Sequence, residues 1–183
     1  LNQPEDLQLL MLAYRLQGQT PPIADWAAAN VASGAVNEFD RPRLLAEETA
    51  RLQSIYDGTA GVGGARLNVR AHFSEYDGGR GGYYLDAYVP GSSIGFEARP
   101  AAYPFRPERV SLAVVNSEEL NFWPLDPESA RQVLERNGRF RIVGAARRGD
   151  GWVLDVRLLG YAINSDTYRD NSRLGELRFD GEG

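Results

Sequence analysis

The clearest candidates for hydrolytic chemistry are a serine in a glycine-flanked turn and a lone histidine. The segment GSSIG, Gly91 to Gly95, matches the G-x-S-x-G pattern, in which a sharp strand-to-helix turn exposes a nucleophilic serine. The residues that follow, FEARPAAYPFRP, contain too much proline to begin a helix. His72 is the only histidine and precedes Ser93, the reverse of the order in that hydrolase pattern. We therefore favour a hairpin turn at this segment and a surface position for His72.

Carboxylates are the other side chains that could catalyse hydrolysis. A carboxylate hydrolase needs two acids that face each other across a cleft and differ in proton affinity. The candidates are Asp86, Glu97 and Glu118. Because spacing along the chain does not show which acids meet in space, we favour solvated surface positions for them. A carboxylate-based hydrolase stays open as an alternative function.

Residue types exclude most cofactor chemistry. The chain has no cysteine and one histidine, which excludes thiolate ligands and histidine-rich metal sites. The glycine-rich segment GTAGVGG, Gly58 to Gly64, follows a predicted helix and precedes a predicted strand, whereas phosphate binding requires a helix after the glycines. The segment SDTYRDNSRLGE, Ser165 to Glu176, lacks the glycine and glutamate positions of a calcium loop. We predict no cofactor and no metal site.

Arginines are the candidate contacts for an anion. All 20 basic residues are arginine, and Arg139, Arg141 and Arg157 lie in two predicted strands around the turn RRGDG. Guanidinium groups suit bidentate contacts with carboxylates and phosphates. Two interpretations are open: an anion-binding face, or a solvated face whose arginines pair with nearby acids, which we favour. The net charge of −5 argues against a nucleic acid partner.

Aromatic side chains are the candidate contacts for a ligand or a partner protein. Alternation along one predicted strand places Tyr84 and Tyr88 on its outward face, and Tyr103 and Trp123 lie in adjacent segments. Exposed tyrosines suit carbohydrate or protein contacts, but internal packing of these rings is the interpretation that we favour. Arg80 lies at the apex of a glycine-rich hairpin turn, YDGGRGGYY, where it is a reachable cation.

Two hydrophobic periods divide the chain. Helical periodicity with terminal glycines predicts helices over residues 4–18, 20–34 and 40–58, and a period of two predicts strands after Gly64. The predicted strands cover residues 67–73, 83–89, 94–99, 110–115, 121–123, 140–146, 152–163 and 174–179. One further helix is predicted over residues 127–137, because a proline and acidic residues stand at its start and Gly138 follows its end.

Helices segregated from strands indicate an α+β fold. We expect three N-terminal helices packed on an antiparallel β-meander, with one inserted helix before a C-terminal hairpin. The 183 residues suit a single domain, 1–183, with a helical part over 1–58 and a β-rich part over 65–183.

The functional expectation follows mainly from the chemistry that is excluded. We expect a non-enzymatic binding or protein-interaction module of a bacterium, located in the cell envelope as a periplasmic or secreted protein, with a cytoplasmic location as the alternative. Its partner would be a protein or a small ligand, and no stretch approaches the roughly 20 apolar residues of a membrane span. A small-molecule or glycan binder that uses the tyrosine strand is the alternative to a protein-interaction module.

Overall fold

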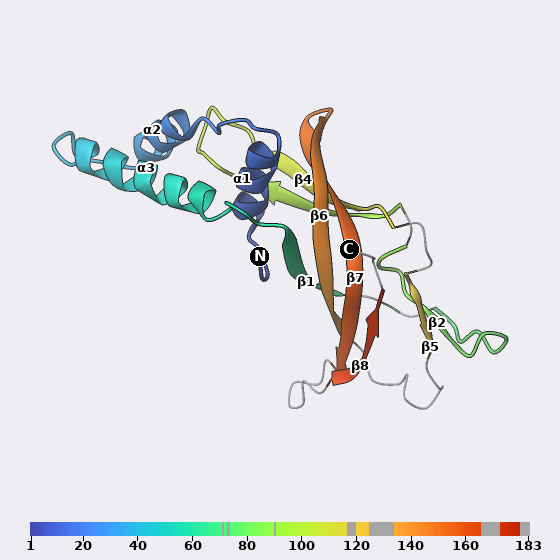
Figure 1. The fold of residues 1–183 in the computed structure, drawn as a ribbon. Helices are drawn as coiled ribbons and strands as arrows, with labels where there is room; N and C mark the ends of the chain where they lie inside the picture. The colour runs from blue at the N-terminus through green and yellow to red at the C-terminus, as the bar shows by residue number, and fades with distance from the viewer. Residues whose placement is uncertain are drawn as a thin grey trace.

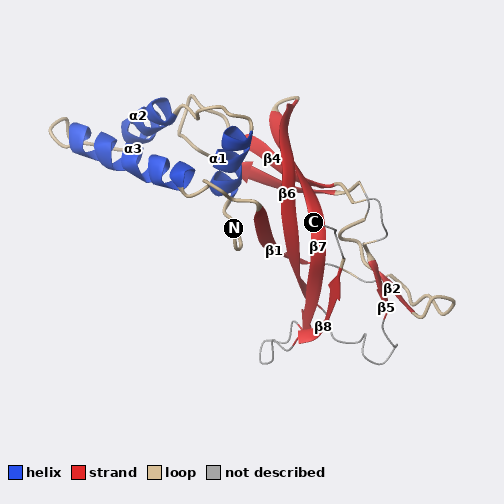
Figure 2. Cartoon of the chain, in the orientation of Figure 1, coloured by secondary structure: helices blue, strands red, loops and turns tan. Residues whose placement is uncertain are grey.

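The computed structural model describes residues 1–70, 72, 74–89, 91–116, 120–124, 134–165 and 173–179. A helical part lies beside a strongly curled sheet, with a small two-stranded sheet at the far side (Figure 1; Figure 2). The α+β class predicted from the sequence is confirmed.

The three N-terminal helices form where the apolar periodicity predicts them. They are α1 (Asp6–Leu16), α2 (Ile23–Ser33) and α3 (Arg41–Asp57). Glu5 and Gln8 make a capping box that satisfies backbone N–H groups at the start of α1, and Gly18 takes a positive φ of 63° just after it. A proline in the first turn opens α3.

The main sheet has the order β1-β6-β7-β4-β3, and β8 also pairs with β7. These strands are β1 (Gly64–Arg70), β3 (Ser93–Ala98), β4 (Glu108–Val114), β6 (Leu134–Arg148), β7 (Gly151–Ser165) and β8 (Arg173–Arg178). The long β6–β7 hairpin forms the spine, and β4 and β8 pair with opposite ends of β7. The predicted RRGDG turn is confirmed, with Gly149 at a φ of 61°. A second sheet pairs β2 (Gly82–Tyr84) with β5 (Phe122–Pro124).

The prediction of a purely antiparallel sheet is wrong, because β4 and β7 run parallel. Their register joins Arg109 to Gly151 and Val114 to Val156. A meander assumes that neighbours in sequence pair with each other. In this sheet β7 lies between β6 and β4. The alternation of side chains along a strand and the turns at its ends do not show which strands will be its neighbours, so the sequence did not indicate this order.

The predicted helix over residues 127–137 is also wrong where it can be tested. Its last four residues, 134–137, belong to β6 and pair with β7 and β1, and its remaining residues lie outside the described ranges. Among the described residues no helix stands between the strands. Pairing on both edges of β6 supplies the backbone hydrogen bonds that override the weak local helix signal.

Only α1 packs directly on the strands, which corrects the expectation that all three helices do so. It lies against β3, β4, β6 and β7, while α2 packs on α3 and α3 packs on α1. Six consecutive residues of α1, Leu9 to Tyr14, are buried, since the sheet encloses one side of the helix and the other helices cover the other. We name α2, α3 and the loop between them the helical arm, and Figure 1 shows it extending away from the sheet.

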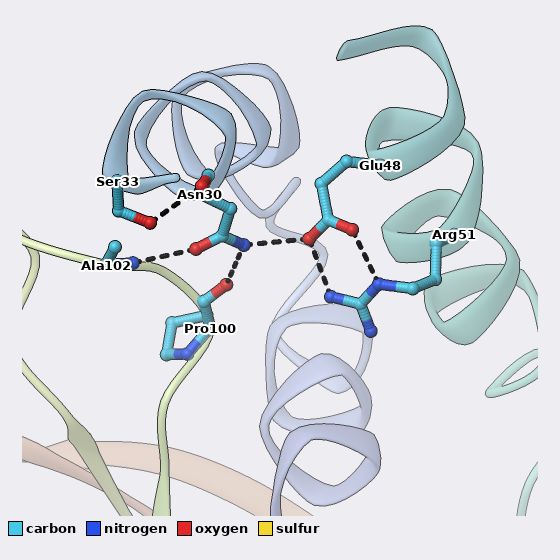
Figure 3. A network of polar contacts seen from close by, with 6 residues as sticks. All are labelled: Asn30, Ser33, Glu48, Arg51, Pro100 and Ala102. Atoms are coloured by element: carbon cyan, nitrogen blue, oxygen red, sulfur yellow. Dashed lines mark hydrogen bonds and ion pairs between the residues drawn. The ribbon is translucent and has the colours of Figure 1, made fainter. Parts of the chain in front are cut away.

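The side chain of Asn30 links the helical arm to the loop between β3 and β4 by hydrogen bonds. Asn30 of α2 donates to the carbonyl of Pro100 at 3.2 Å and accepts from the Ala102 N–H at 2.8 Å (Figure 3). Asn30 also donates to Glu48 of α3 at 2.8 Å, and Glu48 holds Arg51 through two bonds of 2.7 Å. The Arg51 hydrogen bond is the main cause that holds the pKa of Glu48 below its usual range.

The side chain of Asn116 continues the hydrogen bonding to β7 just after the end of β4. Its carboxamide accepts from the Leu158 N–H at 2.7 Å and donates to the Leu158 carbonyl at 3.1 Å, in a buried position. The side-chain amide of Asn116 thus makes the two hydrogen bonds that a backbone peptide group of a neighbouring strand would make. Phe179, just after β8, bonds the next carbonyl, that of Leu159.

Candidate anion-binding face

The outer side of the main sheet carries a cluster of arginines. Side chains of β6 and β7 alternate, so that Phe140 and Leu158 are buried while Arg141 and Arg157 are exposed. The same alternation on β1 exposes Arg66 between buried Ala65 and Leu67. We name this surface the arginine face. Its members are Arg66 of β1, Arg139 and Arg141 of β6, Arg157 of β7 and Arg178 of β8.

Strand register sets these arginines opposite one another. Arg141 pairs directly with Arg157 across β6 and β7, and Arg66 pairs directly with Arg139 across β1 and β6. Like charges at directly opposed positions of an antiparallel pair repel each other and destabilise the sheet. A negative charge beside these arginines would relieve the repulsion.

Compensation from the described residues is confined to one side of the arginine face. Glu176 of β8 lies 3.0 Å from Arg139 and 3.2 Å from Arg178. Gly160 permits the close approach of β8 that brings Glu176 here, because a Cβ there would lie 2.5 Å from the Leu177 carbonyl oxygen. Arg66, Arg141 and Arg157 have no ion pair or side-chain hydrogen bond with the described part of the chain. Asp155, on the outer side of β7, makes no ion pair with these arginines within 4 Å.

Apolar side chains border the unpaired arginines. Val143 occupies a bulge of β6 and is 54% exposed, and Val115, 48% exposed, bonds the carbonyl of Val156 beside Arg157. A hollow of about 540 Å³ runs along β1 and β6 and is lined in part by Arg66 and Arg139. Uncompensated guanidinium groups next to exposed valines suit a partner that brings both carboxylates and apolar contacts.

The predicted anion contacts Arg139, Arg141 and Arg157 thus share one face of two adjacent strands. The favoured alternative, in which nearby acids pair with them, holds for Arg139 alone of the three within the described residues. The sequence reasoning did not include Arg66 and Arg178. Their outward positions on alternating strands are a local signal, but their closeness to β6 and β7 depends on sheet order.

The predicted aromatic contacts do not gather in one pocket. Tyr88 and Trp123 are 2% and 5% exposed and both stack against Tyr161 at 5.7 Å, so the outward position predicted for Tyr88 is wrong. Tyr88 has a positive φ of 65°, which breaks the alternation on which that prediction relied. Tyr103 is 90% exposed on the loop between β3 and β4, far along the chain from the β2 position of Tyr84.

Arg80 folds back onto its own hairpin. Its guanidinium donates to the Tyr84 hydroxyl at 2.7 Å and lies 4.2 Å from the Phe122 ring centroid. The predicted turn is present, since Asp77 pairs with Gly82 and its side chain accepts from the Gly79 and Arg80 N–H groups. Arg80 therefore stabilises the β2–β5 sheet through a cation–π contact.

The candidate acids lie apart. Asp86 contacts His72, with 2.9 Å between Oδ2 and Nδ1, and Glu97 contacts Arg99 at 2.7 Å; both carboxylates are more than half exposed. Glu118 lies outside the described residues. Ser93 is the first residue of β3, so a strand rather than a helix follows GSSIG. The described residues contain no group of three histidines or acids placed to hold a metal ion.

A different carboxylate, that of Glu108, is partly buried between α1 and the sheet. Glu108 of β4 accepts from Trp152 Nε1 at 3.0 Å and from the Tyr14 hydroxyl at 3.3 Å, and Arg147 lies 3.7 Å away. Burial first, and then the charge of Glu108, raise the pKa of Tyr14. Two hydrogen-bond donors and a nearby guanidinium around one acid make it a structural link between α1 and the sheet, which the sequence did not indicate.

Comparison with known proteins yields no relative. No protein family model, no curated protein and no solved structure matches this chain. Within the described residues, no helix has the length and apolar character needed to cross a membrane.

Proposed function

We propose that this chain is a non-enzymatic protein-interaction module of a bacterial cell envelope, and that its arginine face binds an acidic surface of a partner protein. The observation that carries the proposal is the direct opposition of Arg141 and Arg157, both exposed and both unpaired among the described residues. An acidic partner would supply the missing charge, and Val115 and Val143 would supply apolar contact.

The placement of the acids supports a binding role over hydrolysis. Asp86 and Glu97 are each more than half exposed and engaged by His72 and Arg99, and the Glu108 carboxylate is engaged by Trp152 and Tyr14. A carboxylate-based hydrolase needs instead two acids that face each other across a cleft. The cell-envelope location stays a prediction, which fractionation of the native organism with an antibody would test.

A pair of neutral variants tests the arginine face. We expect a glutamate-rich peptide to bind the wild-type chain and to lose roughly tenfold in affinity, ~1.4 kcal/mol, with Arg141→Gln and Arg157→Gln combined. Arg106→Gln, at an exposed arginine on the loop before β4, is the matched control and should bind as the wild type does. Isothermal titration calorimetry provides the measurement, and a short DNA duplex serves as a second probe.

Stability gives an independent readout of the like-charge pair through one further variant, Arg157→Thr. Because Arg157→Thr removes a like-charge pair and places a good strand former on β7, it should raise the free energy of unfolding by ~0.5 kcal/mol while it weakens binding. Equal peptide binding by the wild type and the double variant would contradict the proposal. Tighter binding of the DNA duplex than of the peptide would point to a nucleic acid partner instead.

A further inference from the structure

The tip of the helical arm has the chemistry that the arginine face requires. The loop between α2 and α3 contains Glu38, Phe39 and Asp40 in succession, and Phe39 is 91% exposed. From Ile23 to Asp57 the arm holds six acids and three arginines, a net charge of −3. An exposed aromatic ring between two carboxylates complements exposed valines beside unpaired guanidinium groups.

The tip is held in its projecting conformation. The Asn37 side chain accepts from the Phe39 N–H at 3.2 Å, and the Asn37 carbonyl accepts from the Asp40 N–H at 3.0 Å. Asp40 and Glu47 both contact Arg43, while Glu38 has no ion pair within the described residues. A turn ordered in advance loses less conformational entropy when it binds.

The tip and the arginine face of one chain are too far apart to meet. Figure 1 shows the α2–α3 loop at the outermost end of the arm, while β6 and β7 lie beyond α1. Contact between the two surfaces must therefore join two copies.

We propose that the chain associates head to tail, with Phe39 of one copy against Val115 and Val143 of the next and Glu38 beside Arg141 and Arg157. This inference rests on the proposed function, because it names a second copy of the chain as the acidic partner. The two surfaces differ, so a head-to-tail dimer still has one unoccupied tip and one unoccupied face, and assembly continues beyond a dimer unless a ring closes. A contact made by one loop is small, so the association is weak and concentration-dependent.

Two complementary variants test the inference by sedimentation velocity. The tip variant carries Glu38→Gln and Phe39→Ser, and the face variant carries Arg141→Glu and Arg157→Glu. The wild-type chain should form species larger than a monomer as its concentration rises toward about 1 mM. A weak contact whose dissociation constant is about 1 mM is half occupied in that range. Each variant alone should stay monomeric. Circular dichroism and thermal unfolding confirm that the variants are folded.

Mixing the variants gives the decisive result. The face variant retains an intact tip and the tip variant retains an intact face, so the mixture should form a 1:1 dimer that does not grow further. A mixture that stays monomeric, or a wild-type chain that stays monomeric over the whole range, would overturn head-to-tail association. If the glutamate-rich peptide still binds the wild-type face in that case, the partner is a different acidic protein and the proposed function stands.

Discussion

At the scale of single residues, the side-chain amide of Asn116 makes hydrogen bonds to β7 that a neighbouring strand would otherwise make. Its side chain bonds both the N–H and the carbonyl of Leu158 in a buried position. Asn116→Leu would leave both backbone groups buried without these partners, and a buried unsatisfied group costs about 1–3 kcal/mol. We therefore expect the variant to lower the free energy of unfolding by ~3 kcal/mol in urea titrations.

The matched control for Asn116 is the exposed Asn37→Ala, which removes one hydrogen bond to the Phe39 N–H at the surface. Its expected cost is below ~1 kcal/mol. Equal losses for the two variants would show that the Asn116 bonds do not stabilise the sheet beyond an ordinary surface contact.

Tyr14 predicts how stability responds to alkaline pH. Burial and Glu108 raise its pKa, so the folded state binds the phenolic proton more tightly than the unfolded state does. Its contribution is fully present below the ordinary tyrosine pKa of about 10 and is lost as the pH rises through the higher folded value. Tyr14→Phe should therefore be less stable than wild type at pH 8, and the difference should shrink above about pH 10.

Urea titrations at several pH values measure that difference. Tyr103→Phe, at an exposed ring, is the control and should leave the alkaline stability profile unchanged. A constant difference between wild type and Tyr14→Phe across the alkaline range would contradict the role given to the Tyr14 proton.

At the scale of elements, the arm is attached by apolar packing of Trp26 and Leu52 in the core and by a few specific polar contacts. Asn30 joins α2 to Pro100, Ala102 and Glu48 (Figure 3). Asn30→Ala should release the loop between β3 and β4, so that the Ala102 N–H exchanges with solvent roughly ten- to a hundredfold faster, the equivalent of ~1–3 kcal/mol in local opening. Hydrogen exchange with mass spectrometry reports this segment.

A comparison amide keeps the Asn30 test specific. The Leu158 N–H lies in the sheet, remote from Asn30, and its exchange should change little in the variant. Unchanged exchange at Ala102 would show that the proline-rich loop is positioned without Asn30.

Elements whose signals are local were predictable, and elements that depend on pairing were not. Periodicity and glycine placement predict α1, α2 and α3, and the Arg147–Gly151 turn marks the β6–β7 hairpin. Residues 134–137 carry a local helix signal, yet they lie in β6 because β1 and β7 pair with them. The parallel pairing of β4 with β7 has no local signal at all.

At the scale of the whole molecule, opposite charges are separated in space. The arm carries a net charge of −3, and the arginine face carries unpaired guanidinium groups on the exposed side of β6 and β7. Screening by salt weakens contacts between exposed charges, so both proposed interactions should decline as the ionic strength rises.

The sequence alone determined composition, helix positions and the residue types that could act. It showed a chain without cysteine or lysine, and it identified Arg139, Arg141 and Arg157 as neighbours on a hairpin. Only the tertiary structure decided which groups lack counter-charges, because ion pairing depends on strand order and on side chains that are distant in sequence. For the same reason, it decided that Tyr88 and Trp123 are core rings, and that Glu108 and Asn116 connect elements that no sequence pattern links.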